Sequence, residues 1–277
     1  MEDIAVEGAT CTLFPDGPQW NGKPVATIGK LHCTSPEAAA ALLTRACSDL
    51  AERGCNAVLA PMDGDSWHGY RAVVESDGSP PFAMEPVSGR HDHVALLSAG
   101  FVPLEYYVSS RAPVPHPGLP RPDVDGISVT AWDGQGAELL LGQLHALAGG
   151  SFADKLFFKP LDRAGFFSLY MPLLAAVDPR LVLFARDATG GLAGFLFGLP
   201  DFLQGQRPTQ AILKTYASMR PGVGHLLAWH FHEIARELGF SHVVHALMHS
   251  ANISLERSAQ HDGAVFRRYA LFGKKLG

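Results

Sequence analysis

The chain has 277 residues, of which 47% are hydrophobic, 18% charged and 9% aromatic. This composition is typical of a soluble globular protein of one large or two modest domains, and it excludes an intrinsically disordered chain. It contains no uncharged apolar run long enough to span a membrane. With a formal net charge of −5, the chain is too acidic to favour nucleic acid as a partner. We therefore expect neither a membrane nor a nucleic acid among its partners.

The N-terminal segment and the cysteines predict a cytoplasmic protein. The first residues, MEDIAVEG, place two acids before any hydrophobic stretch and lack the basic and apolar regions of a secretory signal. The 4 cysteines, Cys11, Cys33, Cys47 and Cys55, lie near the start of the chain and form no C-x-x-C pair. We expect reduced thiols, at least three of them in the core, with no disulfide framework and no zinc site.

The first part of the chain predicts alternating strands and helices. In chain order these are strands near 9–14 and 25–33, a helix over 36–53, a strand at 57–60, helices near 66–74 and 91–99, and a strand at 102–109. Thr34 or Ser35, followed by Pro36 and Glu37, is typical of a helix start that caps its own N–H groups.

A proline-rich segment divides the chain. The sequence RAPVPHPGLPRPDVD at 111–125 is too rich in proline to form a helix or a central strand, so we interpret 112–125 as a linker between domains at 1–111 and 126–277. The first domain holds 7 Lys+Arg against 14 Asp+Glu, a net charge of −7, which leaves +2 for the rest of the total of −5. An anionic ligand is therefore expected in the second half.

The second half predicts an α/β order in which helices cover both faces of a mixed sheet. Its elements are a strand at 127–131, helices near 135–148 and 162–176, strands at 181–186, 192–199 and 209–218, a helix at 223–238, a strand at 242–247, a short helix near 252–260 and a strand at 264–272. In the helix at 223–238 the apolar residues recur with helical period, at Leu227, Phe231, Ile234, Ala235 and Leu238.

The two halves contain an internal repeat. LAERGCNAVLAPM at 50–62 and ARELGFSHVVHALM at 235–248 coincide, with one insertion, at an offset of 185 that carries Gly54 onto Gly239. Each segment is the end of an amphipathic helix, a glycine and a short apolar strand. A strand, helix and strand unit is therefore predicted to occur twice.

The segment ILKTYASMRPGVGHLL at 212–227 predicts a strand, a turn with Gly222 and Gly224, and an immediate helix start. Glycines let the backbone approach a ligand closely, and the free N–H groups and dipole of a first helical turn attract a phosphate or pyrophosphate. Alone, such a pattern also fits an ordinary tight turn.

With its surroundings, this segment resembles the GNAT superfamily of acyl-CoA-dependent N-acyltransferases. Met219-x-x-Gly222-x-Gly224 fits the glycines of the family's pyrophosphate loop, although Met219 replaces Arg or Gln, and Asn252 matches its asparagine after the fifth strand. The first half resembles the family more weakly, through PMDGDSWHGYR at 61–71 and Gly100-Phe101. The whole chain is similar to a tandem, two-domain GNAT protein with a degenerate N-terminal domain.

The resemblance implies an N-acyltransferase that uses acyl-CoA, in particular acetyl-CoA, and transfers the acyl group to a primary amine by direct attack in a ternary complex, with no metal. It implies a coenzyme A site formed by Tyr216, Ala217, Ser218, Met219, Pro221, Gly222, Val223, Gly224, His225, Leu226 and Asn252. The family's usual tyrosine acid falls on Ala259. Candidates for proton transfer are then His249, Ser258 and Tyr269, each of which is also open to a purely structural interpretation.

The repeat indicates that the first half binds no coenzyme, because Gly222 falls on Glu37 and Gly224 on Ala39. We interpret the segment 61–71 either as part of the acceptor-site wall or as a capped helix with packing aromatics. The expected acceptor is a small-molecule amine or an amino-acid-like molecule, and the acidic first half favours a cationic one. The protein is expected to be a monomer or a homodimer.

Two other functions stay open on the sequence. A non-catalytic module that binds acyl-CoA, or a scaffold, would tolerate the missing tyrosine and the altered loop. A metal hydrolase is suggested by HFHEIAR, but the H-E-x-x-H motif fails because residue 236 is Arg236.

Overall fold

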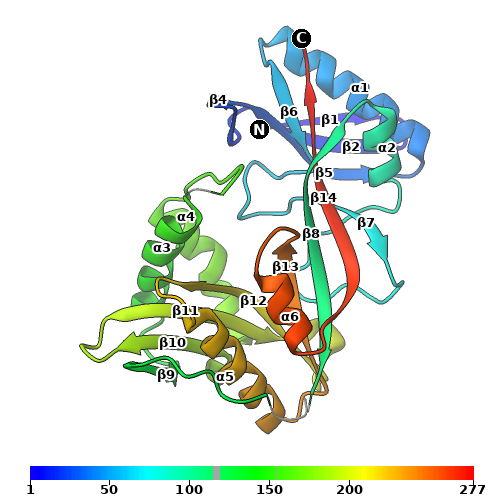
Figure 1. Cartoon of the computed structure of the whole chain (residues 1–277). Helices are drawn as coiled ribbons and strands as arrows, with labels where there is room; N and C mark the ends of the chain where they lie inside the picture. The colour runs from blue at the N-terminus through cyan, green and yellow to red at the C-terminus, as the bar shows by residue number, and fades with distance from the viewer. Residues whose placement is uncertain (115–118, 154) are drawn as a thin grey trace.

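The protein is a mixed α/β structure with one large twisted sheet (Figure 1). The computed structural model describes residues 1–114, 119–153 and 155–277. Within these residues the strands are β1 (Glu2–Val6), β2 (Ala9–Phe14), β3 (Gln19–Trp20), β4 (Lys23–Pro24), β5 (Ala26–Cys33), β6 (Ala57–Ala60), β7 (Ala72–Ser76), β8 (Val102–Pro113), β9 (Ile127–Ala131), β10 (Val182–Asp187), β11 (Leu192–Pro200), β12 (Gln210–Ser218), β13 (His242–His249) and β14 (Ala264–Lys275). The helices are α1 (Pro36–Glu52), α2 (Asp92–Ser98), α3 (Ala137–Phe152), α4 (Arg163–Tyr170), α5 (Val223–Glu237) and α6 (Ser254–Gln260), with short 3-10 turns at Met171–Ala176, Pro179–Leu181 and Phe202–Gln204.

The predicted repeat is confirmed. The unit β5, α1 and β6 in the first half corresponds to β12, α5 and β13 in the second, in the order strand, helix, strand. In both units the two strands pair in parallel, which a helical crossover permits. The helix stripe is also confirmed, because Leu227, Phe231 and Ala235 are buried and Ile234 and Leu238 pack against the same core.

The last strand of each half pairs with the sheet of the other half. The sheet runs β1-β2-β5-β6-β14-β8-β13-β12-β11-β10-β9, with β7 beside β14. Thus β14 pairs with β6 of the first half, β8 pairs with β13 of the second, and the long strands β8 and β14 pair with each other at the centre (Figure 1). Sheet pairing therefore crosses the proposed domain boundary.

The predicted linker overlaps the end of β8, which extends to Pro113. Residues 115–118 of the linker lie outside the described part of the chain. At 119–126 the chain runs beside α5, where Trp229 Nε1 donates to the backbone oxygen of Leu119 at 2.9 Å.

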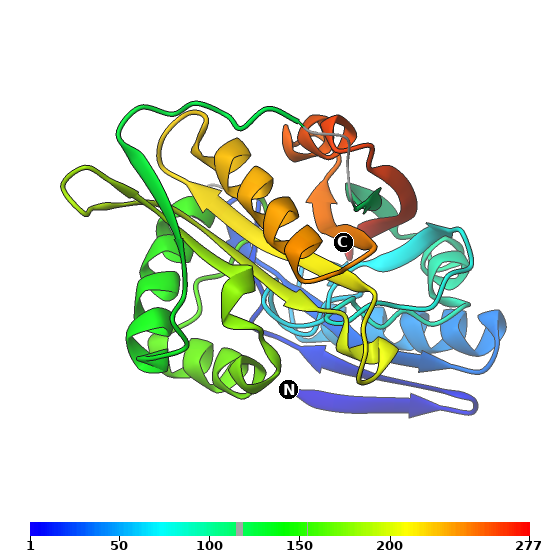
Figure 2. The same cartoon turned by 90° about the horizontal axis from the view of Figure 1, so that it is seen from below.

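Helices cover both faces of the second-half sheet (Figure 2). On β10, Val182 and Phe184 face a core shared with α3 and α4, whereas Leu183 and Ala185 face a core shared with α5. This alternation follows from the two-residue period of a strand. In the first half, α1 and α2 pack on one face of the sheet.

One predicted helix in the first half is wrong. The segment near 66–74 forms a turn, a bridge between Met62 and Tyr70, and then strand β7, which pairs with β14. Arg71 adopts a φ of 85°, which is incompatible with a helix, and the two valines that follow favour a strand.

The cysteines are free and belong to the first-half core. Cys11 and Cys47 are buried, and Cys33 and Cys55 are partly buried and pack against the same core. Among the described residues, no helix is long and apolar enough to cross a membrane.

Candidate active site

A gap opens between β12 and β13. The two strands pair in parallel from Gln210 beside His242 to Leu213 beside His245, and within the described residues they make no further pairs. The register of β12 against β11 shifts at the same point, which leaves Lys214 as a β-bulge. Because bulges bend a strand, this one directs the rest of β12 away from β13.

A cavity of about 1260 Å³ contains this gap. Its wall includes Ala228 of α5, which belongs to one face of the sheet, and Leu141 of α3 and Phe166 of α4, which belong to the other. The cavity therefore reaches both faces through the separated strands.

The first half supplies a further wall of the cavity. Residues from Ser66 to Arg71 line it. Asp65 Oδ1 accepts a hydrogen bond from the Trp67 backbone N–H at 2.8 Å, and Trp67 Nε1 donates to the backbone oxygen of Lys159 at 2.8 Å. The Trp67 ring also packs against Phe166 with ring centroids 5.5 Å apart. The segment 61–71 thus packs the first half against α4 and the chain between α3 and α4.

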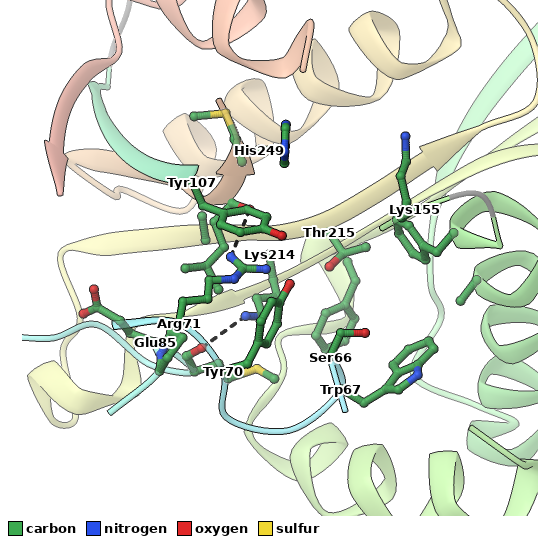
Figure 3. Close-up of a pocket in the computed structure, with 18 of the residues that line it drawn as sticks. Ser66, Trp67, Tyr70, Arg71, Glu85, Tyr107, Lys155, Lys214, Thr215 and His249 are labelled. Atoms are coloured by element: carbon green, nitrogen blue, oxygen red, sulfur yellow. Dashed lines mark hydrogen bonds between the residues drawn. The ribbon is translucent and has the colours of Figure 1, made fainter. Parts of the chain in front are cut away.

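Two cationic side chains meet at the gap (Figure 3). The guanidinium of Arg71 lies between two rings, 3.9 Å from the Tyr70 centroid and 3.7 Å from the Tyr107 centroid, and its Nη1 donates to the backbone oxygen of Leu247 at 3.3 Å. Burial lowers the pKa of Arg71 to about 10, so the group is still charged at neutral pH.

Lys214 is the second cation, and its Nζ donates to the Met84 backbone oxygen at 3.1 Å. Burial, and after it the positive charge of Arg71, lower the pKa of Lys214 to about 7. Lys214 and Arg71 therefore interact unfavourably at the gap.

The carboxylates near these cations have partners of their own. Glu85 is buried and accepts hydrogen bonds from Tyr269 and from Arg267. Glu105 pairs with Nε2 of His249. Among the described residues, no group of three or more His, Cys, Asp and Glu side chains is placed to hold a metal ion.

Two of the three predicted proton-transfer candidates line the cavity. His249 lies on its wall, but both ring nitrogens have partners, since Nε2 contacts Glu105 and Nδ1 accepts from the Ala251 N–H at 3.1 Å. Tyr269 is fully buried and is not among the described lining residues. Burial and the adjacent Glu85 raise the pKa of Tyr269, which keeps its proton in place.

The third candidate, Ser258, also lines the cavity and belongs to a buried polar chain. Its Oγ contacts Ser110 Oγ and lies 2.7 Å from His245 Nδ1, while His245 Nε2 lies 2.8 Å from His232 Nε2. Burial lowers the pKa of His245 to about 3, so the imidazole is neutral at neutral pH.

The predicted coenzyme segment forms the end of β12 and the start of α5. Gly222 is the N-cap of α5 with a φ of 82°, and no side chain caps this helix start. A Cβ on Gly224 would lie 2.7 Å from Arg257 Nη1 and 2.9 Å from Tyr216 Cε2, so a larger residue would have to displace these side chains. Arg257, which the sequence patterns did not single out, thus places a cation over the uncapped helix start.

The other predicted coenzyme residues surround this helix start. Tyr216 Oη accepts from Arg257 Nη1 at 3.0 Å and donates to Ser254 Oγ at 2.9 Å, and Asn252 Oδ1 accepts from the Ser254 N–H at 3.0 Å. Tyr216 and Asn252 line the cavity, whereas the described residues from 217 to 226 do not. Ser218, Met219 and Pro221 are exposed, His225 is half-buried, and Ala217, Val223, Gly224 and Leu226 are buried.

The corresponding places in the first half are closed. Of the two predicted caps, Ser35 is the one that accepts a hydrogen bond from the Ala38 N–H, at 3.1 Å, whereas Thr34 donates to Gly8. Asp63 Oδ1 accepts from the Lys30 N–H at 2.7 Å, so the segment after β6 occupies the space beside β5. The uncapped helix start and the open gap are therefore features of the second half.

Comparison with solved structures shows the fold. A GCN5-related N-acetyltransferase from Sphaerobacter thermophilus superposes with a TM-score of 0.62 at 12% identity, over 97% of this chain and 77% of that one. A tandem GNAT protein from the clavulanic acid biosynthesis pathway gives a TM-score of 0.57 at 15% identity, over 98% of this chain and 79% of that one. A GCN5-related N-acetyltransferase from Anabaena variabilis gives 0.57 at 9% identity, over 97% of this chain and 60% of that one.

The chain therefore has the GNAT fold, in the tandem arrangement that the resemblance implied. No protein-family model matches the chain, and no curated protein is found to match it.

Proposed function

We propose that the protein is an acyl-CoA-dependent N-acyltransferase that takes acetyl-CoA and acylates a primary amine by direct attack in a ternary complex. The observation that carries this proposal is the cavity that passes through the gap between β12 and β13 and is lined from both faces of the sheet. Two substrates can enter it from opposite sides and meet between the strands, which direct transfer requires.

The donor belongs at the start of α5. The uncapped first turn presents N–H groups and the positive end of the helix dipole, and Arg257 adds a full positive charge beside them. A diphosphate bound there would place the pantetheine arm along the end of β12, with the thioester in the gap. Residues 216–218 and Asn252 are the groups that we assign to this arm.

In the transfer, the amine nitrogen forms a bond to the thioester carbonyl carbon, the carbon–sulfur bond breaks, and the proton lost by the amine goes to a base. His249 is the candidate acceptor of that proton, after releasing the Ala251 N–H from Nδ1. Ser258 is the candidate donor to the departing thiolate, since it lines the cavity and is hydrogen-bonded to neutral His245.

Release of free thiol from acetyl-CoA in the presence of a library of primary amines tests the proposal. We expect release that depends on both the amine and the protein, with a product heavier by one acetyl group in mass spectrometry. Binding of CoA without release for any amine would instead support a non-catalytic acyl-CoA-binding module.

A further inference from the structure

Arg71 is a buried cation without an anionic partner. The residue is 5% exposed, and among the described residues no carboxylate lies within ion-pair distance of it. Within the same residues, its Nε has no hydrogen-bond partner. Burying a charge of this kind is strongly unfavourable unless something compensates it. The rings of Tyr70 and Tyr107 compensate only part of that cost.

The surrounding structure holds Arg71 in this unfavourable position. Its φ of 85° lies in the left-handed region, which is unfavourable for a non-glycine residue. Lys214 places a second positive charge near Arg71, and the charge of Arg71 lowers the pKa of Lys214. Arg71, held in a strained backbone conformation, and Lys214 face one cavity. This arrangement is expected of a site for an anionic ligand group.

The position of Arg71 indicates that the anionic group belongs to the acceptor and not to the donor. Its Nη1 contacts Leu247 of β13, and Lys214 is the bulge residue of β12, so the two cations stand at the two sides of the gap. The diphosphate of the donor has its own cation, Arg257, at the start of α5. In an α-amino acid the carboxylate and the amine are separated by one carbon. A carboxylate on Arg71 therefore leaves the amine next to the gap.

Another part of the cavity wall indicates the chemistry of the acceptor's side chain. Trp67 packs with Phe158, Phe166 and Tyr170, at ring-centroid distances of 5.6, 5.5 and 6.4 Å, and all four line the cavity. Trp67 and the two cations line the same cavity (Figure 3), and this aromatic wall suits a large apolar group.

We propose that Arg71, with Lys214 beside it, binds the carboxylate of the acceptor, and that the acceptor is an α-amino acid with a large apolar side chain. The planar guanidinium, held between two rings, presents its N–H groups in one plane, which matches a carboxylate. The role as acceptor rests on the proposed function, whereas the binding of a carboxylate at Arg71 does not. An acceptor with a carboxylate and an apolar side chain differs from the cationic acceptor that the net charge of the first half suggested.

The test uses matched pairs of ligands that differ only in the carboxylate: phenylalanine and phenethylamine, tryptophan and tryptamine, leucine and isopentylamine. Each is titrated into the full-length protein with CoA present, by calorimetry. In at least one pair we expect the amino acid to bind at least tenfold more tightly than its amine. Arg71→Met should remove that difference, and Arg71→Lys should retain part of it. CoA affinity, measured on both variants, reports that they are folded.

Arg186→Met is the matched control, because Arg186 also lies over an aromatic ring, that of Phe184, but is not among the described lining residues. It should bind every ligand as the wild type does. Equal affinity within every pair, or an Arg71→Met protein that keeps the full preference, would overturn the inference.

Thiol release separates this inference from the proposed function. Acetylation of phenethylamine as fast as phenylalanine would leave the acyltransferase in place and reject the carboxylate site. A carboxylate preference that depends on Arg71, with no thiol release for any amine, would keep the site and reject the acyltransferase.

Discussion

At the residue scale, Lys214 is a charged group of the cavity wall that lowers the stability of the folded protein. Its ammonium lies in a site that favours the neutral amine, because burial and the charge of Arg71 both lower its pKa, to about 7. A cation kept in such a place weakens the folded state, which is common where a binding site needs the charge.

The pH dependence of unfolding tests this description of Lys214. Its folded pKa of about 7 lies below the ordinary lysine value of about 10.4. Between these values the unfolded chain binds more protons, so the free energy of unfolding contributed by Lys214 rises with pH. The penalty is complete below pH 7 and disappears above about pH 10.4.

Lys214→Met should therefore raise the free energy of unfolding at pH 7 by roughly 1–3 kcal/mol, after the lost bond to Met84 is allowed for. The gain should shrink steadily toward pH 10. Urea unfolding at several pH values measures it, with the exposed Lys23→Met as control. A variant that is less stable than the wild type at pH 7 would contradict the buried, repelled ammonium.

At the scale of elements, the starts of α5 and α1 are opposite in character. The start of α5 has glycines, no side-chain cap and Arg257 above it, whereas Ser35 caps α1 and Glu37 lies in its first turn. A polyanion is attracted to the first and repelled by the second.

Gly224→Val and Arg257→Gln should each weaken CoA binding at least tenfold, which is about 1.4 kcal/mol. Valine would displace Arg257 and Tyr216 from above the helix, and glutamine would remove the charge. Ser35→Ala is the control: it should cost about 1 kcal/mol of stability and leave CoA affinity unchanged. If calorimetry finds wild-type affinity in both of the first two variants, the donor site is not at α5.

The sequence predicted the elements with strong local signals. The helical stripe around Phe231 and the offset repeat located α5, β12 and β13, because their periodicity and turn residues are local. The segment near 66–74 was predicted wrongly, since its strand forms only by pairing with β14, far along the chain. The proximity of Arg71 and Lys214 was missed for the same reason, because no local pattern connects residues that the tertiary structure brings together.

The whole molecule is held together by the exchange of β8 and β14. Without residues 1–125, β13 would lose β8, and β14 would lose β6, β7 and β8. Unpaired central strands expose backbone groups and promote aggregation.

A fragment of residues 126–277 should therefore fail to fold alone, with no cooperative unfolding transition by circular dichroism. Co-expression with residues 1–125 should restore a soluble complex. A fragment that unfolds cooperatively by itself would show that the exchanged strands are dispensable.

Calorimetric titration of the full chain with CoA tests the central claim most directly. Within the part of the chain that the structure describes, only the second half has both an open gap between its parallel strands and an uncapped helix start. We predict one equivalent of CoA per chain. No binding would contradict the donor site, and a second equivalent that is lost on mutating Ser35 and Glu37 would show that the first half binds coenzyme as well.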